Sequence, residues 1–194
     1  MSAHPGWRVA FRYETEVTPL IQAGYSGSGS RREVDWTQTQ HFKHGWVSAR
    51  VPAHFHLRKS ETRRERLQVV KENGQLSVVN GLGAPVKSIW LADSTGKIYQ
   101  AETIAAGQKG GLALSKQSAD GGKIRHEELF KGIGFTAQTD SLKDDAGKYL
   151  RPGTYIAVLE GNPFIENALG SAASPKRTKS AAVVFGILDS SDTK

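Results

Sequence analysis

The sequence predicts a mainly β protein: an antiparallel β-sandwich with a long irregular insertion and one or two short helices. Two observations carry this prediction. Alternating segments joined by tight turns fill the stretch from Arg66 to Glu102, and helical periodicity is almost absent from the rest of the 194 residues. About nine or ten strands with turns at short spacing are typical of a sandwich or barrel.

The stretch from Arg66 to Glu102 begins with a hairpin. Apolar and polar residues alternate from Leu67 to Glu72, and a return strand carries Leu76 to Asn80. Between them, Asn73-Gly74 suits a type I′ turn, because both central residues of that turn need a positive φ.

Two more strands complete this stretch. Val86 to Asp93 is rich in β-branched and aromatic residues, which predicts a strand buried over most of its length. Asp93-Ser94-Thr95-Gly96 is a turn signal, and Lys97 to Gln100 is the strand that follows it. Gly107 to Gly111 is expected to form a hairpin loop, since it lacks the spacing of a phosphate-binding loop and a following helix.

Strands are also expected on either side of this stretch. Arg151-Pro152-Gly153 has the residue order of a type II turn, which would lead into one of these strands. The exception is His126–Lys131, where one or two helical turns are expected. The further strands are Trp7–Val17, the polar segment Val34–Gln40, Trp46–Val51 before Pro52, Phe55 and Leu57 alternating with His54 and His56, Leu112–Ser115, Thr154–Glu160, and Ala181–Leu188 as the last core strand.

The domain organisation follows from this order of strands. Residues 1–65 are expected to form an N-terminal β-strand extension that packs on the sandwich. Residues 66–190 are expected to form the sandwich, with residues 118–149 as its insertion, and the whole is expected to be one compact unit.

The turn motifs support a comparison with known folds. Leu150-Arg151-Pro152-Gly153-Thr154-Tyr155 resembles the L-x-P-G-x-Y turn and strand of bacterial immunoglobulin-like and transthyretin-like sandwich modules. Val79-Asn80, followed by the segment from Pro85 to Tyr99 with its D-x-x-G turn, resembles the same modules. The combination is similar to extracytoplasmic β-domains of bacterial membrane proteins of unknown function. The resemblance covers Leu67 to Leu188 and implies the fold alone.

Composition bounds the location and the chemistry. The chain has no cysteine, which excludes disulfides and thiolate metal sites. It contains no apolar run of transmembrane length, and Met1 to Pro5 show no signal-peptide pattern. An extracytoplasmic location, periplasmic or at the cell surface, is favoured if the chain is a fragment, and a cytoplasmic one if Met1 is the native start.

A formal net charge of +7 favours contact with nucleic acid or another anionic surface. The candidate binding residues are the basic side chains of an arginine-rich connection and of a second basic stretch, because arginine and lysine contact phosphate. They are Arg58, Lys59, Arg63, Arg64, Arg66, Lys176, Arg177 and Lys179. The alternative is a solvated linker, which the interspersed Glu61 and Glu65 favour.

The histidines are the candidate metal ligands. His54 and His56 are expected to share one face of a strand, and His44 or Asp35 would supply a third ligand for Zn²⁺. The alternative is that both histidines lie on the solvent face of a strand whose core residues are Phe55 and Leu57.

No catalytic constellation stands out in the sequence. The paired acids of the insertion, such as Asp144-Asp145, have nothing that fixes their separation, and Gly27-Ser28-Gly29 lies in a glycine-serine loop instead of a strand-to-helix elbow. The sequence therefore predicts a non-catalytic binding or scaffolding module without a cofactor. Its expected partner is another protein or the remainder of its own membrane protein. A nucleic-acid-binding accessory protein is the alternative, and a metal-dependent hydrolase is the third.

Overall fold

The computed structural model describes residues 9–20, 32–46, 54–116, 124, 126–130, 149–165 and 180–188. The chain divides into two compact units. The first unit holds Met1–Arg63 and Phe164–Thr178, and the second holds Arg64–Pro163 and Lys179–Lys194. The predicted boundary at 65/66 lies two residues from this division, whereas residues 164–178 group with the first unit. The packing of residues 1–65 on the sandwich stays a prediction.

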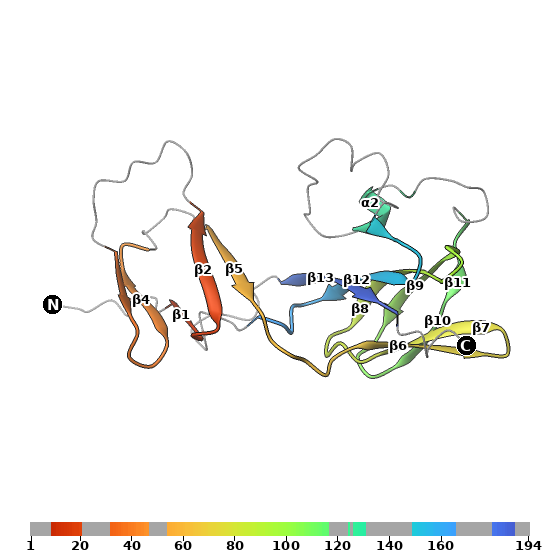
Figure 1. Cartoon of the computed structure of the whole chain (residues 1–194), viewed down its shortest axis with the longest axis horizontal. Helices are drawn as coiled ribbons and strands as arrows, with labels where there is room; N and C mark the ends of the chain where they lie inside the picture. The colour runs from red at the N-terminus through yellow and green to blue at the C-terminus, as the bar shows by residue number, and fades with distance from the viewer. Residues whose placement is uncertain are drawn as a thin grey trace. The chain divides into compact units, whose positions relative to one another are not determined.

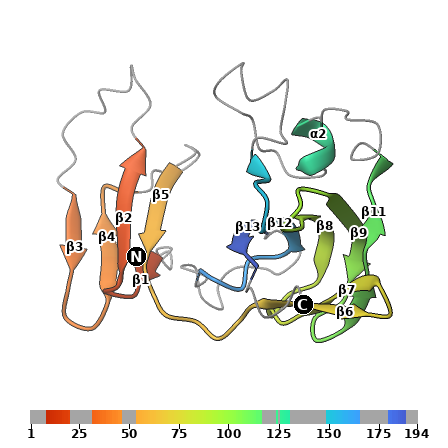
Figure 2. The same ribbon diagram turned by 45° about the vertical axis from the view of Figure 1, so that its right-hand side comes forward.

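The described strands of the second unit form two antiparallel sheets (Figure 1, Figure 2). One has five strands in the order β11-β9-β8-β12-β13, and the other has three in the order β10-β7-β6. The strands are β6 (Leu67–Glu72), β7 (Gln75–Asn80), β8 (Val86–Ala92), β9 (Ile98–Ile104), β10 (Lys109–Gly111), β11 (Ala113–Leu114), β12 (Thr154–Glu160) and β13 (Ala181–Ile187). The predicted mainly β, antiparallel class is confirmed.

The turns of this unit have the geometry that the sequence predicts. Asn73 and Gly74 have φ angles of 51° and 79°, the left-handed pair of a type I′ turn between β6 and β7. Gly153 has a φ of 78°, and the Thr154 amide donates to the Arg151 carbonyl at 3.0 Å, which closes the turn before β12.

The turn between β8 and β9 is held by one carboxylate. Asp93 Oδ1 accepts hydrogen bonds from the Thr95 amide at 2.8 Å, from the Thr95 hydroxyl at 2.7 Å and from the Lys97 amide at 2.9 Å. Partial burial raises the pKa of Asp93, but the hydrogen bonds from Thr95 and Lys97 outweigh it, and the net pKa is lowered.

The central strands of the five-stranded sheet are buried on both faces. Trp90 and Ile156 are register partners on one face, and Ile89 and Ala157 are register partners on the other; all four are buried. The first face carries a core cluster that also contains Leu129, from the single helical turn α2 (His126–Leu129). The remaining buried members of that cluster are Ala92, Ile124, Phe130 and Leu150.

The first unit is also built from antiparallel strands around an aromatic core. Its sheets have the orders β1-β4-β3 and β2-β5. Phe11 and Phe42 are buried and meet edge to face at 5.8 Å, with Val17 and Leu57 packed against them. The strands are β1 (Val9–Phe11), β2 (Thr15–Leu20), β3 (Glu33–Asp35), β4 (Gln40–His44) and β5 (His54–Lys59).

The predicted single strand from Trp7 to Val17 is wrong. The chain turns between β1 and β2, and the Thr15 amide donates to the Arg12 carbonyl at 3.2 Å. The buried amide of Gln40 stabilises this turn, because its Nε2 donates to the carbonyls of Arg12 at 2.7 Å and Thr15 at 2.6 Å. The turn is therefore set by a residue that lies far along the sequence.

Three further predictions need correction. Val34–Gln40 is not one strand, since β3 ends at Asp35 and β4 begins at Gln40. The segment Gly107–Gly111 is not all loop, because β10 pairs with β7 through Lys109 to Gly111. Ala181–Leu188 does form a strand, but among the described strands β13 lies at the edge of its sheet, and its residues are partly exposed, so it is not a core strand. Most of Trp46–Val51 and of the 118–149 insertion lies outside the described residues.

Candidate functional site: an open sheet edge

The most distinctive surface feature of the second unit is the outer edge of β13. The register pairs Thr154 with Ile187, and the Leu188 amide donates to the Gly153 carbonyl at 2.8 Å. Residues 188, 186, 184 and 182 therefore turn their backbone groups toward β12, because hydrogen-bonded pairs alternate along an antiparallel ladder. At the other end of β12, the Glu160 amide donates to the Pro85 carbonyl, on the β8 side, which agrees with this alternation.

The alternate residues of β13 turn their backbone N–H and C=O groups away from β12. We call this row the open edge, and it consists of Ala181, Val183, Phe185 and Ile187. Within the part of the chain that the structure describes, β13 pairs with β12 alone. A row of such groups is a template for pairing with another strand.

The side chains of the open edge are apolar and partly exposed. Phe185 is 55% exposed and Ile187 is 84% exposed. Val183 packs against the core cluster of Trp90 and Ile156, and the Phe185 ring lies 6.2 Å from that of Tyr149. The open edge therefore continues a core face out to the surface.

The other described edge strands of this unit are shorter or carry charges. β11 has two residues and β10 has three, and β6 includes Lys71 and Glu72. β13 has seven residues, none of them ionisable and none of them proline. Charges, proline and short length are the usual protections of an edge strand, and β13 lacks all three.

A close packing contact adds to the ladder that holds β13 against β12. Tyr155 on β12 is the register partner of Gly186, and its ring occupies the space where a Cβ atom on Gly186 would lie. Burial raises the pKa of Tyr155, while a hydrogen bond with the Leu67 backbone acts in the opposite direction. Tyr155 thus links β13 and β12 to β6 of the three-stranded sheet.

Two basic residues of the arginine-rich connection, Lys59 and Arg63, make local contacts within the first unit. Lys59 Nζ lies 2.8 Å from Glu61, and Arg63 forms an ion pair with the same carboxylate. Arg63 also donates to the Phe164 carbonyl at 2.9 Å and lies 5.3 Å from the centre of the Phe164 ring. The Lys59 hydrogen bond, with Arg63, lowers the pKa of Glu61.

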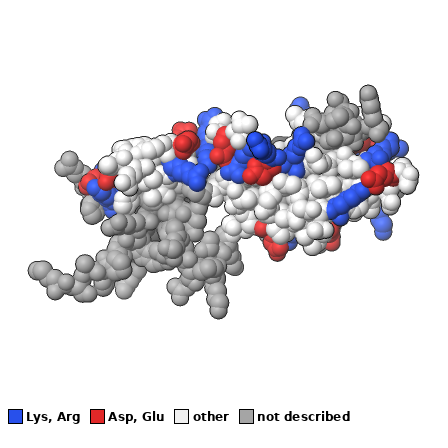
Figure 3. All heavy atoms as spheres, turned by 90° about the horizontal axis from the view of Figure 1, so that it is seen from below, with Lys and Arg blue, Asp and Glu red and all other residues white. Residues whose placement is uncertain are grey.

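The remaining predicted basic residues divide into two groups. Arg58, Arg64 and Arg66 are exposed. Lys176, Arg177 and Lys179 lie outside the described residues. On the face that Figure 3 views, acidic side chains lie among the basic ones. Of the five predicted basic residues that the structure describes, three are thus exposed and two are paired with Glu61.

The predicted metal ligands lie on two strands of the first unit. His54 and His56 are exposed on the same face of β5, opposite Leu20 and Thr18 of β2. His44 pairs with Glu33 through the backbone, and its side chain lies outside the described residues. Among the described residues, no group of three or more His, Asp or Glu side chains could hold a metal ion.

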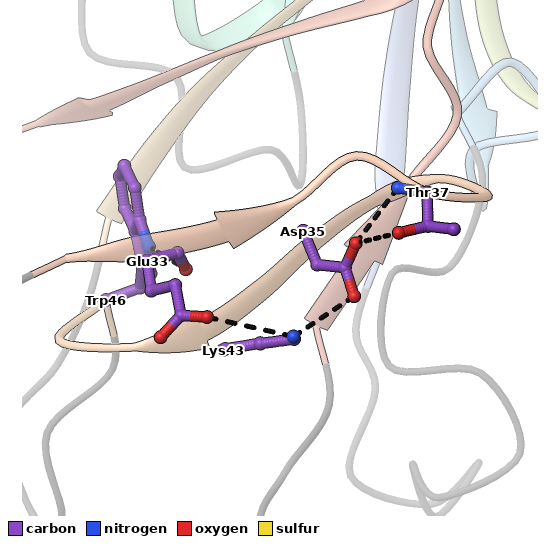
Figure 4. Close-up of polar contacts among 5 residues, drawn as sticks. All are labelled: Glu33, Asp35, Thr37, Lys43 and Trp46. Carbon is purple, nitrogen blue, oxygen red and sulfur yellow. Dashed lines mark hydrogen bonds and ion pairs between the residues drawn. The ribbon is translucent and has the colours of Figure 1, made fainter.

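A polar cluster that the sequence did not reveal lies on the β3–β4 hairpin (Figure 4). Lys43 Nζ lies 3.1 Å from Asp35 and 3.7 Å from Glu33. Hydrogen bonds from the Thr37 side chain and amide, and then from Lys43, lower the pKa of Asp35, and Asp35 in turn raises the pKa of Lys43. Trp46 Nε1 donates to the Glu33 carbonyl at 3.0 Å. The cluster fixes the hairpin and presents no unpaired reacting group among these five residues.

Two exposed aromatic residues of the first unit, Tyr13 and Trp36, stack on each other. Tyr13 and Trp36 are 51% and 59% exposed, and their rings are nearly parallel with centres 6.4 Å apart. The Tyr13 hydroxyl donates to the Trp36 carbonyl at 2.6 Å. This contact pins the loop after β3 to the turn between β1 and β2.

Comparison with protein-family models, with curated proteins and with solved structures finds no match to this chain. Within the described residues, no helix is long and apolar enough to cross a membrane.

Proposed function

We propose that the chain is a non-catalytic binding or scaffolding module whose second unit binds an extended protein segment along the open edge of β13. The observation that carries this proposal is the edge itself: seven residues without charge or proline, with four residues that present their backbone groups outward. An added strand would satisfy those groups and would cover Phe185 and Ile187.

We also propose that the second unit is an antiparallel β-sandwich of the immunoglobulin-like or transthyretin-like kind. Residues on both faces of β8 and β12 are buried, so each face needs a covering layer. Tyr155 reaches from the five-stranded sheet to the backbone of Leu67 in the three-stranded sheet, which supports the latter as one of those layers.

The resemblance of the turn motifs supports a further part of this proposal, an extracytoplasmic module of a bacterial membrane-associated protein. The test is the gene sequence upstream of Met1. A membrane segment or export signal encoded there supports this part. A native start at Met1 with neither would overturn it and leave the binding proposal standing.

The binding proposal is tested with a synthetic peptide of residues 180–188, extended by lysines for solubility and labelled with a fluorophore. We expect its anisotropy to rise when it is titrated with the full chain. Ile187→Lys should weaken this binding, because it places a charge on the open edge at a position that is 84% exposed. The matched control is Leu114→Lys, since Leu114 is 50% exposed at the opposite edge of the same sheet.

The two variants make the result specific. Binding that Ile187→Lys weakens and Leu114→Lys leaves unchanged supports the open edge as the binding surface. A peptide that does not bind, or that binds wild type and Ile187→Lys equally, contradicts the proposal.

A nucleic-acid-binding role is the second candidate function. It is supported by the exposure of Arg58, Arg64 and Arg66 and by the net charge of +7. Its test is binding to a DNA duplex at two salt concentrations, where salt-sensitive binding supports it and salt-insensitive or absent binding ends it.

A metal-dependent hydrolase is the third candidate. It is supported by the shared exposed face of His54 and His56. Metal analysis after dialysis with Zn²⁺ tests it, and the absence of bound zinc would exclude this role.

A further inference from the structure

We propose that the open edge pairs with a second copy of itself, so that two chains join through antiparallel β13 strands related by a two-fold axis at Val184. This inference rests on the proposed function, because a second copy can pair with the open edge only if the edge binds an added strand. It goes further by naming that strand as β13 of a second chain.

The backbone of β13 is suited to two-fold pairing. When Val184 lies opposite Val184 of the second copy, Ala181 falls opposite Ile187 and Val183 falls opposite Phe185. All four of these residues turn their N–H and C=O groups outward. Each therefore meets an outward-facing residue of the second copy, which is the arrangement that hydrogen-bonded pairs of an antiparallel ladder require.

The side chains match in size in the same register. The largest exposed side chains of the strand, Phe185 and Ile187, lie opposite the smaller Val183 and Ala181. All four point to the same face of the sheet, since residues two apart share a face. The pairing therefore places a large side chain beside a small one at each position and covers both exposed apolar groups.

The charge pattern also favours self-pairing. A two-fold axis gives the two strands the same charges in one pair, so an edge strand that carries one sign of charge repels its copy. β13 has no ionisable residue between Ala181 and Ile187. Two copies therefore meet without like charges in the strands, and the two five-stranded sheets become one continuous sheet.

The first test is the oligomeric state of the full chain, measured by sedimentation velocity over a concentration series. We expect wild type to dimerise and Ile187→Lys to raise the dimer dissociation constant at least about tenfold, because each lysine replaces an apolar side chain that lies opposite Ala181 in an uncharged strand pair. Leu114→Lys, at the other edge, should leave the constant unchanged.

The second test reports the register by cysteine cross-linking, which the cysteine-free chain allows without background. In Val184→Cys, the two sulfur-bearing residues face each other in a non-hydrogen-bonded pair with Cα atoms about 4.5 Å apart, within the range of a disulfide. We expect mild oxidation to link this variant into a dimer. Ile187→Cys is the control. In the proposed register the two cysteines of this variant lie six positions apart, or about 20 Å along the strand pair, so they should not form a disulfide.

The outcomes separate this inference from the proposed function. A monomeric chain that still binds the 180–188 peptide overturns self-pairing and keeps the edge as a site for another protein. A monomer that binds no peptide overturns both. A dimer that Ile187→Lys leaves intact, or that Ile187→Cys cross-links as well as Val184→Cys does, overturns the proposed interface.

Discussion

The side-chain amide of Asn80 donates to the carbonyl of Ile104 at 3.0 Å, inside the second unit where Asn80 has no exposed surface. The same Nδ2 lies 2.9 Å from the Ala84 carbonyl and 3.2 Å from the Ala105 carbonyl. Asn80 Oδ1 accepts from the Leu82 amide at 3.1 Å. One buried side chain therefore joins the end of β7, the loop before β8 and the end of β9.

Asn80→Ala should reduce the free energy of unfolding by about 2–4 kcal/mol, because it leaves buried backbone groups without a partner. Urea unfolding measures this change. Gln68→Ala, at an exposed position of β6, should change stability by less than about 0.5 kcal/mol. Equal effects of the two substitutions would contradict the role of Asn80 as the joint between these segments.

The second prediction concerns Gly186 and Tyr155. Gly186→Ala should destabilise the chain by about 1–3 kcal/mol, because its methyl group would overlap the Tyr155 ring. In a Tyr155→Leu background the same substitution should cost less, which a double-mutant cycle by urea unfolding measures. Gly111→Ala is the matched control, since a Cβ there meets no atom within 4 Å. Additive effects of the two substitutions would refute the close packing.

The third prediction concerns the pH dependence of stability. The net pKa of Asp93 lies below its ordinary value of 3.8, so its charged form stabilises the folded state. That contribution is complete above the unfolded value and is lost as the pH falls through the lower folded value. Asp93→Asn keeps an oxygen acceptor but removes the charge, so the stability difference from wild type should shrink below about pH 3.8.

Urea unfolding at a series of pH values measures the Asp93 effect. The control is Glu14→Gln at an exposed position of the β1–β2 turn. A difference between wild type and Asp93→Asn that stays constant from neutral to acid pH would argue against a stabilising charge at this turn.

The sequence predicts the local turns well and the long-range features poorly, for a physical reason. Asn73-Gly74 and Pro152-Gly153 specify their turns through φ preferences of their own residues, which the structure confirms. The turn at Arg12 has no glycine or proline, and the amide of Gln40 holds it from a distant strand. Alternation alone predicts a continuous strand there.

The sequence does not reveal the open edge of β13, because hydropathy shows how apolar a strand is and not where the strand lies in its sheet. The segment AAVVFGI is as apolar as a central strand, and the sequence therefore predicts a core position for Ala181–Leu188. Its place at an edge follows from the strand order, which depends on pairing between segments far apart in the chain. The Glu61 contacts of Lys59 and Arg63 are likewise visible only in the folded chain.

The last prediction concerns Glu61 and tests the nucleic-acid alternative. Lys59 and Arg63 both pair with this carboxylate, so Glu61→Gln removes a negative charge that lies beside two cations. If the arginine-rich connection binds phosphate, the variant should bind a DNA duplex more tightly at low salt, and its affinity should fall more steeply as salt rises. Fluorescence anisotropy with a labelled duplex measures both quantities. Glu14→Gln makes the same change in net charge at a distant position of the sequence. An equal gain in both variants would assign the effect to net charge, and no gain in either would remove this connection as a nucleic-acid site.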